Sequence, residues 1–356
     1  MPATTATPSL LASRQRSSAL EQAIADRPQA FRILTGDRPT GPLHIGHYFG
    51  TLQNRVRLQD AGVQLFVLIA DYQAITDRPA AVDLPRTVLG LVADYLAVGV
   101  DPGRATIFAH SQIEPLNQLL LPFLSLVSVA EIGRNPTVKD EAAAAGSAAM
   151  SGLMFTYPVH QAADILFCHA NLVPVGQDQL PHLELTRSVA RRFNARYSPA
   201  APYFAEPAAL LSSAPLLLGL DGTKMGKSRA NSIAIRASAD ETARLVAAAK
   251  TDSERVISYE PERRPEVSNL VLIAALCRDE TPEAVATQIG AGGAAALKAA
   301  VTEAINDRFA ATRARRAELS NEAGYLRDVL ADGNERACAI AAETLAVVRR
   351  LMYQSY

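Results

Sequence analysis

The sequence has no tryptophan, only three cysteines, and a formal net charge of −1 over 356 residues. Cys168, Cys277 and Cys338 are too few and too widely spaced for a disulfide framework or a zinc knuckle, and they suit a reducing compartment. We therefore expect a cytoplasmic protein. The near-neutral charge excludes nucleic-acid binding through bulk basicity, but it allows a local basic face. No apolar run approaches ~20 residues, so no membrane span is expected, and the N-terminus lacks the order of a signal peptide.

The chain is long enough for two domains with a sizeable core. Residues 1–30 are predicted to be an extension that ends in a short helix at about 17–26. Strands and helices then alternate, with strands expected at 31–36, 63–71 and 105–111 and helices at 45–60 and 84–100. This order predicts an α/β fold with a parallel sheet, whose ligands bind beyond the carboxyl ends of the strands. The last ~125 residues are alanine-rich and are predicted to be helical.

A pair of histidines follows the first expected strand, in "GPLHIGH" (41–47). His44 and His47 are three residues apart, so one helical turn brings them to the same side. They could bind a metal, but the nearby acids do not complete a coordination set. Free N–H groups at a helix start together with two imidazoles would bind phosphate, and Gly46 would allow close approach of a nucleotide. The alternative is a turn with exposed histidines.

A second phosphate-binding pattern stands 180 residues later, in "GTKMGKS" (222–228). Lys224 and Lys227 lie in a glycine-containing loop beside Ser228. Two flexible ammonium groups on such a loop suit a polyphosphate whose charge shifts during a reaction. Either pattern is weak by itself, but the two together are far more specific.

An amino-acid pocket is indicated by "TYPVHQAADI" (156–165). Pro158 suits the first position of a helix, so we expect the helix to begin there. Gln161 and Asp164 would then face the same way, with Tyr157 one turn earlier. An acid in this apolar setting needs a donor partner, which a ligand or a neighbouring loop could supply.

Three further segments leave alternatives open. The small-residue stretch 139–152 is either a mobile loop or an alanine-rich helix. The apolar stretch "LLPFLSLVSVA" (120–130) is either a subunit interface or an internal helix. The segment "NDRFAATRARRAEL" (306–319) is either a solvated helix face or a binding surface, and its arginines are Arg308, Arg313, Arg315 and Arg316.

The two phosphate-binding patterns, "HIGH" at 44–47 and "KMGKS" at 224–228, resemble the HIGH and KMSKS signatures of class I aminoacyl-tRNA synthetases. Four longer blocks are similar to bacterial tryptophanyl-tRNA synthetases, and the resemblance spans about residues 31–350. These blocks are "YLAVGVDPGRATIFAHSQI", "TYPVHQAADILF", "LVPVGQDQLPHLELTRSVARRFN" and "KTDSERVISYEPERRPEVSNL". The resemblance implies a Rossmann-like catalytic domain over 31–228 and a helical anticodon- and tRNA-binding domain over 229–356.

The resemblance also implies a two-step reaction. ATP activates L-tryptophan to tryptophanyl-adenylate, and the amino acid then passes to tRNA(Trp). Mg²⁺ would accompany ATP, no resident metal and no membrane contact are expected, and the family is homodimeric. Catalysis would come from alignment and from stabilisation of charge on the phosphates.

Roles transfer by position from the family. The implied catalytic residues are His44, His47, Lys224 and Lys227. The implied ATP-binding residues add Arg38, Thr40, Gly46, Gly176, Asp178, Gln179 and Ser228. The implied amino-acid-binding residues are Tyr157, Gln161, Asp164, Val173 and Gln179, with Asp164 accepting the indole N–H. The implied tRNA-binding residues are Arg308, Arg313, Arg315 and Arg316.

Several positions depart from the family pattern. Leu34 stands where an aromatic residue is usual, Gln161 replaces a methionine, Gln73 a histidine and Arg38 a glutamine, while Lys139 or Glu141 falls near an expected lysine. The nearest alternative is a tyrosyl-tRNA synthetase, because its pocket shares the Tyr-x₃-Gln-x₂-Asp spacing. A second alternative is a synthetase-like nucleotide- or tRNA-binding module that serves a partner protein.

Overall fold

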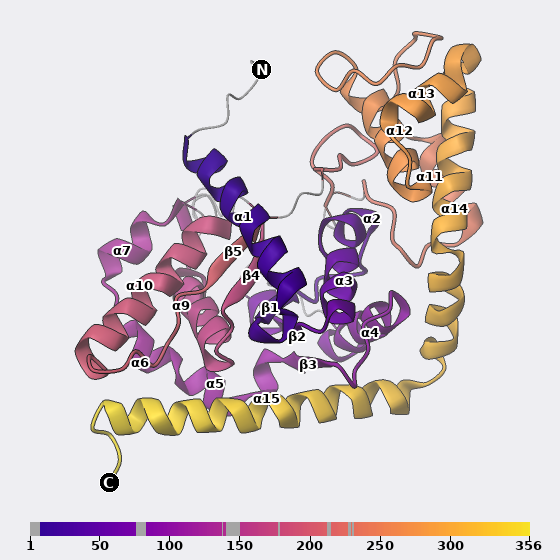
Figure 1. The fold of residues 1–356 in the computed structure, drawn as a ribbon. Coiled ribbons are helices and arrows are strands. Elements are labelled where there is room, and N and C mark those ends of the chain that lie inside the picture. Colours follow the sequence, from indigo (N-terminus) through magenta and orange to yellow (C-terminus); the bar gives the residue numbers. More distant parts are fainter. Residues whose placement is uncertain are drawn as a thin grey trace.

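The computed structural model describes residues 8–75, 83–136, 138–139, 150–176, 179–211, 215–226, 229 and 231–356, with side chains from residue 17 onward (Figure 1). The elements, in chain order, are α1 (Pro8–Asp26), η1 (Pro28–Ala30), β1 (Arg32–Asp37), α2 (Ile45–His47), η2 (Tyr48–Leu52), α3 (Gln53–Ala61), β2 (Gln64–Ile69), η3 (Tyr72–Ile75), α4 (Leu84–Ala97), β3 (Ala105–Ala109), η4 (His110–Gln112), α5 (Glu114–Gln118), α6 (Leu120–Leu124), α7 (Val129–Arg134), α9 (Gly152–Phe167), β4 (Leu172–Val175), α10 (Leu180–Tyr197), β5 (Ala208–Leu211), α11 (Ala239–Ala247), α12 (Pro265–Arg278), α13 (Pro282–Ile289), η7 (Gly290–Gly292), α14 (Gly293–Ser320) and α15 (Ala323–Leu351).

Within the described ranges, five strands form one parallel sheet in the order β3-β2-β1-β4-β5. The parallel α/β fold expected from the sequence is confirmed, and the strands expected at 31–36, 63–71 and 105–111 are β1, β2 and β3. The chain runs outward from β1 to β3 and returns to β4 on the other side of β1. This reversal places a topological switch point between β1 and β4, which is where ligands bind in such sheets.

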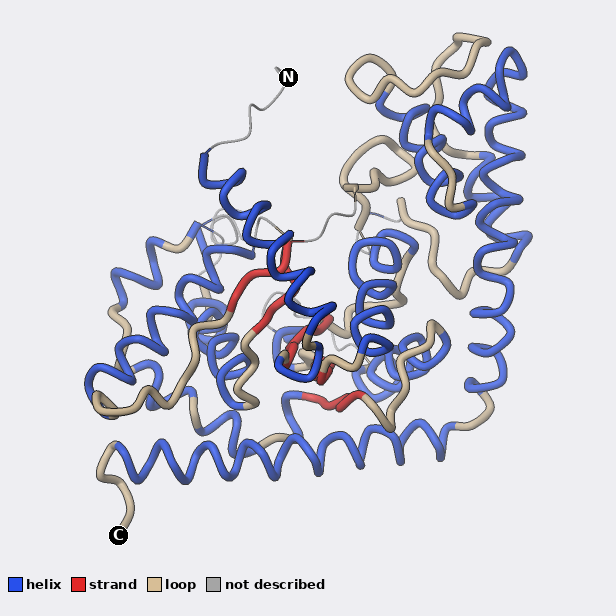
Figure 2. Tube along the Cα trace, in the orientation of Figure 1, coloured by secondary structure: helices blue, strands red, loops and turns tan. Residues whose placement is uncertain are grey.

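Helices cover both faces of the sheet, as Figure 2 shows. Successive residues of a strand point to opposite faces, and the buried side chains separate accordingly. Ile33 packs into a core with α3, α4 and the C-terminal helices α12 and α14. Its neighbour Leu34 packs into a second core with α5, α9, α10 and α15. The sheet is buried on both sides, which explains its uninterrupted apolar strands.

The C-terminal part is helical, as the sequence predicts. Between residues 232 and 356 the structure describes helices and a single isolated bridge, at Ala234. Within Pro282–Ser320, one 18-residue window has a mean hydropathy of 1.2, which is enough by length and composition to cross a membrane but is weak evidence. The buried residues Leu297, Val301, Ile305 and Phe309 of α14 belong to the first core.

The first and last helices cover the two edges of the sheet (Figure 1). On β3, the N–H of Ala109 donates to Asn334 Oδ1 at 3.0 Å, and Arg336 Nη2 donates to the carbonyl of Ala105 at 3.0 Å. On β5, the N–H of Leu211 donates to Ser17 Oγ at 3.0 Å. Backbone groups at a strand edge need such partners, because they cannot pair within the sheet.

Gly333 of α15 lies against the backbone of β3. A Cβ atom at this position would meet the carbonyl oxygen of Ile107 at 1.8 Å, so helix and strand would have to separate. We expect Gly333→Ala to lower the free energy of unfolding by about 1–3 kcal/mol, which is typical of overpacking. Chemical denaturation measures this change. The matched control is Gly324→Ala on the same helix, where nothing lies within 4 Å. Equal stability of the two variants would contradict the proposed clash.

Several expected boundaries change in the structure. The helix expected to begin at Pro158 begins at Gly152 instead, because Ser151 Oγ accepts the N–H of Met154 at 3.1 Å and caps it, leaving Pro158 inside. The helix expected at 45–60 is interrupted by the π-helical turn η2. The extension helix starts at Pro8. In the stretch 120–130, Phe123 is buried whereas Leu121 and Val129 are each 73% exposed. Most of 139–152 lies outside the described residues.

Candidate active site

A cavity of about 310 Å³ opens at the carboxyl ends of β1 and β4, at the switch point of the sheet. Its walls come from β1, β4, α9, the start of α10 and the helical run after β1. The residues singled out from the sequence that line it are Leu34, Arg38, Gln73, Tyr157, Gln161, Asp164, Val173, Gly176 and Gln179. The segments of α9 and β4 that the sequence predicted to hold an amino acid and a nucleotide therefore share one cavity.

Asp164 lines this cavity and is 1% exposed. Its Oδ1 accepts a hydrogen bond from His110 Nε2 at 2.6 Å. Its Oδ2 is buried and has no hydrogen-bond partner among the described residues. A buried carboxylate oxygen is costly unless a donor reaches it. An N–H or O–H group that reached this oxygen would supply the donor that it lacks among the described residues.

His44 and His47 stand at the start of the helical run after β1. His44 has an extended backbone, its N–H donates to His47 Nδ1 at 3.2 Å, and the two ring centroids are 3.7 Å apart. The N–H of Ile45 donates to the carbonyl of Ile233 at 3.0 Å. The expectation that the N–H groups at this helix start are free is therefore wrong for Ile45. Anion binding here would depend on the imidazoles.

The two phosphate-binding patterns meet in space. A Cβ atom on Gly46 would lie 3.0 Å from Met225 Sδ and 3.0 Å from the ring of His44. Gly46 thus packs closely against Met225 of the 224–226 segment, in addition to any role under a nucleotide. Lys224 pairs with Leu218 in an antiparallel bridge. Asp178, Lys227 and Ser228 lie outside the described residues.

The sequence profile described as "tRNA synthetases class I (W and Y)" matches residues 27–310. The chain belongs to this family. Tryptophan–tRNA ligases of Streptococcus agalactiae serotype V and Streptococcus pyogenes serotype M1 are each 40% identical, over 341 and 339 residues, and cover 91% of this chain and 98% of their own. The tryptophanyl-tRNA synthetase of Campylobacter jejuni with ADP and tryptophan superimposes with a TM-score of 0.79 at 29% identity, over 91% of this chain and 100% of its own. The resemblance found in the sequence is confirmed.

The segment 218–226, which contains Lys224, is anchored on α12 in this synthetase. The side chain of Asn269 makes two hydrogen bonds to the backbone of Leu218. Its Oδ1 accepts the N–H of Leu218 at 2.8 Å, and its Nδ2 donates to the carbonyl of Leu218 at 3.1 Å. Lys250 extends the anchor, because its N–H donates to the carbonyl of Leu220 and its Nζ contacts Glu266 at 2.6 Å. Asn231 braces the loop from within by donating to the carbonyl of Lys224 at 3.2 Å.

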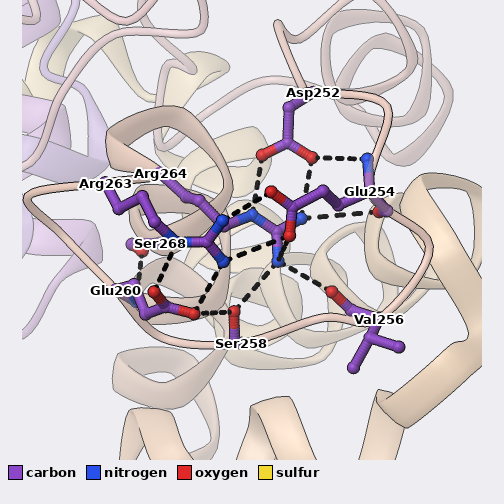
Figure 3. A network of polar contacts seen from close by, with 8 residues as sticks. All are labelled: Asp252, Glu254, Val256, Ser258, Glu260, Arg263, Arg264 and Ser268. Atoms are coloured by element: carbon purple, nitrogen blue, oxygen red, sulfur yellow. Dashed lines mark hydrogen bonds and ion pairs between the residues drawn. The ribbon is translucent and has the colours of Figure 1, made fainter.

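The block 250–270, singled out in the sequence, folds into a polar network in front of α12 (Figure 3). The Arg264 guanidinium is buried and binds both oxygens of Asp252 at 2.7 Å, the carbonyl of Val256 at 2.7 Å and Ser258 Oγ at 2.9 Å. Hydrogen bonds from Arg263 and Ser258 lower the pKa of Glu260 to about 2. The network fixes the loop before α12, and α12 in turn holds Leu218.

A largely buried ion pair between Asp37 and Arg55 forms part of the cavity wall of the synthetase. Asp37, the last residue of β1, accepts hydrogen bonds from Arg55 Nη1 at 2.6 Å and from the hydroxyl of Tyr95 at 2.8 Å. Burial by itself would raise the pKa of Asp37. The charges of Arg55 and His47 and the two hydrogen bonds outweigh burial, so the pKa is well below its usual range.

The ion pair makes stability depend on pH. Because the pKa of Asp37 is lower in the folded chain, its contribution is complete above the unfolded pKa of about 3.9 and is lost as the pH falls further. We expect the wild-type protein to lose roughly 1–2 kcal/mol more than Asp37→Asn between pH 5 and 3. Urea unfolding at several pH values measures the difference. Asp60→Asn, at an exposed position, is the control. If the free energy of unfolding of Asp37→Asn depended on pH as steeply as that of this control, the assignment would be refuted.

The arginines of α14 have partners inside the molecule. Arg316 Nε donates to the buried Asp94 at 2.7 Å, and the other oxygen of Asp94 accepts the N–H of Leu43 beside the histidine pair at 3.3 Å. Arg313 contacts Asn306 and Thr242. Arg308 pairs with Asp279 and stacks over Tyr48. Arg315 is 48% exposed and contacts Glu318 on the same helix.

Sequence reasoning missed three residues in or beside the cavity. His182 on α10 and Thr35 on β1 line the cavity, and His182 contacts the hydroxyl of Tyr157 at 3.2 Å. His110 follows β3 directly and lies outside the lining, where it binds Asp164. The signal available for His110 was its place at the carboxyl end of a predicted strand, where ligand-binding residues gather. Thr40 does not line the cavity; its N–H donates to the carbonyl of Arg38 at 2.8 Å.

Proposed function

We propose that this synthetase activates L-tryptophan with ATP and transfers it to tRNA(Trp). The observation that carries the proposal is the buried Oδ2 of Asp164, which has no hydrogen-bond partner among the described residues, in a cavity whose walls include the apolar side chains of Leu34, Ile165 and Val173. An indole ring matches such a pocket, because it presents one N–H donor on an apolar body. The tryptophan–tRNA ligases of the two Streptococcus species agree with this choice.

In the first step, a carboxylate oxygen of tryptophan attacks the α-phosphorus of ATP and pyrophosphate leaves. We assign His44, His47, Lys224 and Lys227 to the phosphates, with Mg²⁺ travelling on ATP. The contact between Gly46 and Met225 supports this assignment, because it brings the two signatures to one place. Catalysis then depends on donors already placed where negative charge grows.

The remaining site residues divide between the two substrates. We assign Tyr157, Gln161 and Val173 to the amino acid together with Asp164, and Gln179 to both substrates. Arg38 and Gly176 are assigned to ATP. All of these residues line the one cavity, which supports the assignment. Thr40, Gly46, Asp178 and Ser228 are assigned to ATP from the family pattern alone.

We also propose a cytoplasmic homodimer. The exposed apolar side chains of Leu121 on α6 and Val129 at the start of α7 support an interface that includes the stretch 120–130, because an interface would cover these apolar groups.

The test is ATP–pyrophosphate exchange with tryptophan and with tyrosine. Faster exchange with tyrosine would make the chain a tyrosyl-tRNA synthetase, and no exchange with either amino acid would favour a binding module. The absence of tryptophan from the sequence adds a direct measurement. Emission from added tryptophan can be followed on binding with almost no protein background, with tyrosine as competitor.

Arg315 is the residue of the α14 run best placed to contact tRNA, because the other three are held within the molecule. We expect Arg315→Gln to weaken tRNA binding. The slope of the logarithm of the binding constant against the logarithm of the salt concentration should become smaller in magnitude by about 0.7–0.9, the value for one phosphate contact. Binding measured at several salt concentrations tests this. Arg316→Gln is the control, since loss of its contact with Asp94 should lower stability and leave the slope unchanged. A wild-type slope in Arg315→Gln would exclude the contact.

A further inference from the structure

A cluster of buried aromatic and polar side chains lies directly behind Asp164. The rings of His110 and His160 stack with centroids 4.5 Å apart, and the ring of Tyr72 lies 6.2 Å from each. His110 is 0% exposed and His160 is 3% exposed. Among the described residues, His110, His160 and Asp164 also form the one group of side chains spaced closely enough to hold a metal ion.

Asn117 fixes this cluster. Its Nδ2 donates to the carbonyls of His110 at 2.8 Å and Ile113 at 3.0 Å. Its Oδ1 therefore faces His160 Nε2, at 2.9 Å, and accepts the proton there. Burial lowers the pKa of His160, which favours a neutral ring. One amide thus holds both the backbone of His110 and the ring that stacks on it.

The ring of His110 is consequently held with Nε2 on Asp164. Oδ1 of the carboxylate can only accept, so Nε2 carries the proton of this 2.6 Å hydrogen bond. The contact fixes the orientation of the Asp164 carboxylate. Asp164 lines the cavity, and its Oδ2 has no hydrogen-bond partner among the described residues. Without a donor on Oδ1 the carboxylate could turn, and neither oxygen would have a defined place.

We propose that His110 is a positioning residue for side-chain selection: it orients Asp164 so that Oδ2 recognises the ring N–H of the amino acid. The inference rests on the proposed function. The protein supplies one of the two donors that this buried carboxylate needs, and the substrate supplies the other. An amino acid without a ring N–H leaves Oδ2 unpartnered, and an unmade hydrogen bond to a buried charged group is expensive. Selectivity therefore depends on His110 as well as on Asp164.

The experiment compares two amides at position 110. Glutamine can place its NH₂ group where Nε2 of histidine lies, whereas asparagine is too short to reach Asp164. Pyrophosphate exchange is measured with tryptophan and with benzothienylalanine, in which sulfur replaces the ring N–H. We expect His110→Asn to raise the KM for tryptophan by at least ~10-fold and to reduce the preference over benzothienylalanine by at least ~10-fold, the scale of one hydrogen bond to a charged group. The KM for ATP should stay within about twofold, and His110→Gln should remain within about threefold of wild type.

Three results would overturn the proposal. Equal effects of His110→Gln and His110→Asn would show that a donor at the position of Nε2 is not needed. An unchanged preference in His110→Asn, with exchange reduced equally for both amino acids, would show a merely structural role. Stoichiometric transition metal in the purified wild type, lost in His110→Gln, would make the cluster a metal site. Failure of the proposed function looks different: wild type would not exchange with tryptophan, or Asp164→Asn would keep the wild-type preference.

Discussion

Replacing His47 by alanine should slow formation of the adenylate by at least ~10²-fold, the scale for loss of one donor that stabilises transition-state charge. His47 stands beside His44, close to the loop that begins at Lys224, and its charge acts on the buried Asp37. Single-turnover measurement of adenylate formation gives the rate directly. We expect most of this loss to appear as a lower kcat and less of it as a higher KM, because the donor acts on charge that develops during the reaction.

Two conservative variants separate the roles of His47. Its Nδ1 accepts the N–H of His44, so it also caps the helical run. Asparagine can keep that acceptor but removes the donor at Nε2, whereas glutamine can keep a donor near Nε2 and removes the cap. We expect His47→Asn to be as slow as His47→Ala and His47→Gln to recover part of the rate. Near-wild-type exchange in His47→Asn would refute the contact with phosphate.

Asp164→Asn should reduce kcat/KM for tryptophan by at least ~10²-fold. The hydrogen bond from the indole N–H to a charged carboxylate is lost, and the NH₂ group of asparagine, itself a donor, then faces that N–H. His110 Nε2 would still hold Oδ1, so the new NH₂ group would turn into the cavity. There it would face the indole N–H. Exchange with tryptophan and with phenylalanine, at saturating ATP, measures the change.

Asp164→Ala is the matched control because it removes the acceptor without adding a donor. We expect it to abolish the selection of tryptophan over phenylalanine, with a smaller loss of exchange with tryptophan than in Asp164→Asn. Preference for tryptophan over phenylalanine at the wild-type level in both variants would remove Asp164 from recognition.

The sequence predicts the local parts of the fold well. β1, β2, β3 and α4 are long apolar or amphipathic segments, and local periodicity suffices for them. β4 and β5 have only four residues each, and β4 pairs with β1 across more than 130 residues, which no local pattern indicates. The start of α9 was misplaced because the preference of Pro158 for a helix start gave way to the cap at Ser151 and to the packing of the whole helix.

In the candidate site too, local relations could be predicted from the sequence, whereas contacts between distant segments could not. Residues in contiguous motifs, such as Gln161 and Asp164, could be placed because helix spacing fixes their relation. His110 and Asp164 are 54 residues apart and meet through the packing of η4 against α9, so their contact needed coordinates. The partners of Arg313 and Arg316 are 71 and 222 residues away, which is why an apparently free basic run turned out to be largely internal.

The N-terminal helix α1 ends at Asp26, before the region that matches the family profile, yet it sits on β5 and satisfies the N–H of Leu211. A version of the enzyme that begins after Asp26 would leave this strand edge uncovered. We expect such a version to self-associate during expression and storage, because uncovered strands template pairing. We therefore expect this helix to contribute to solubility rather than to turnover.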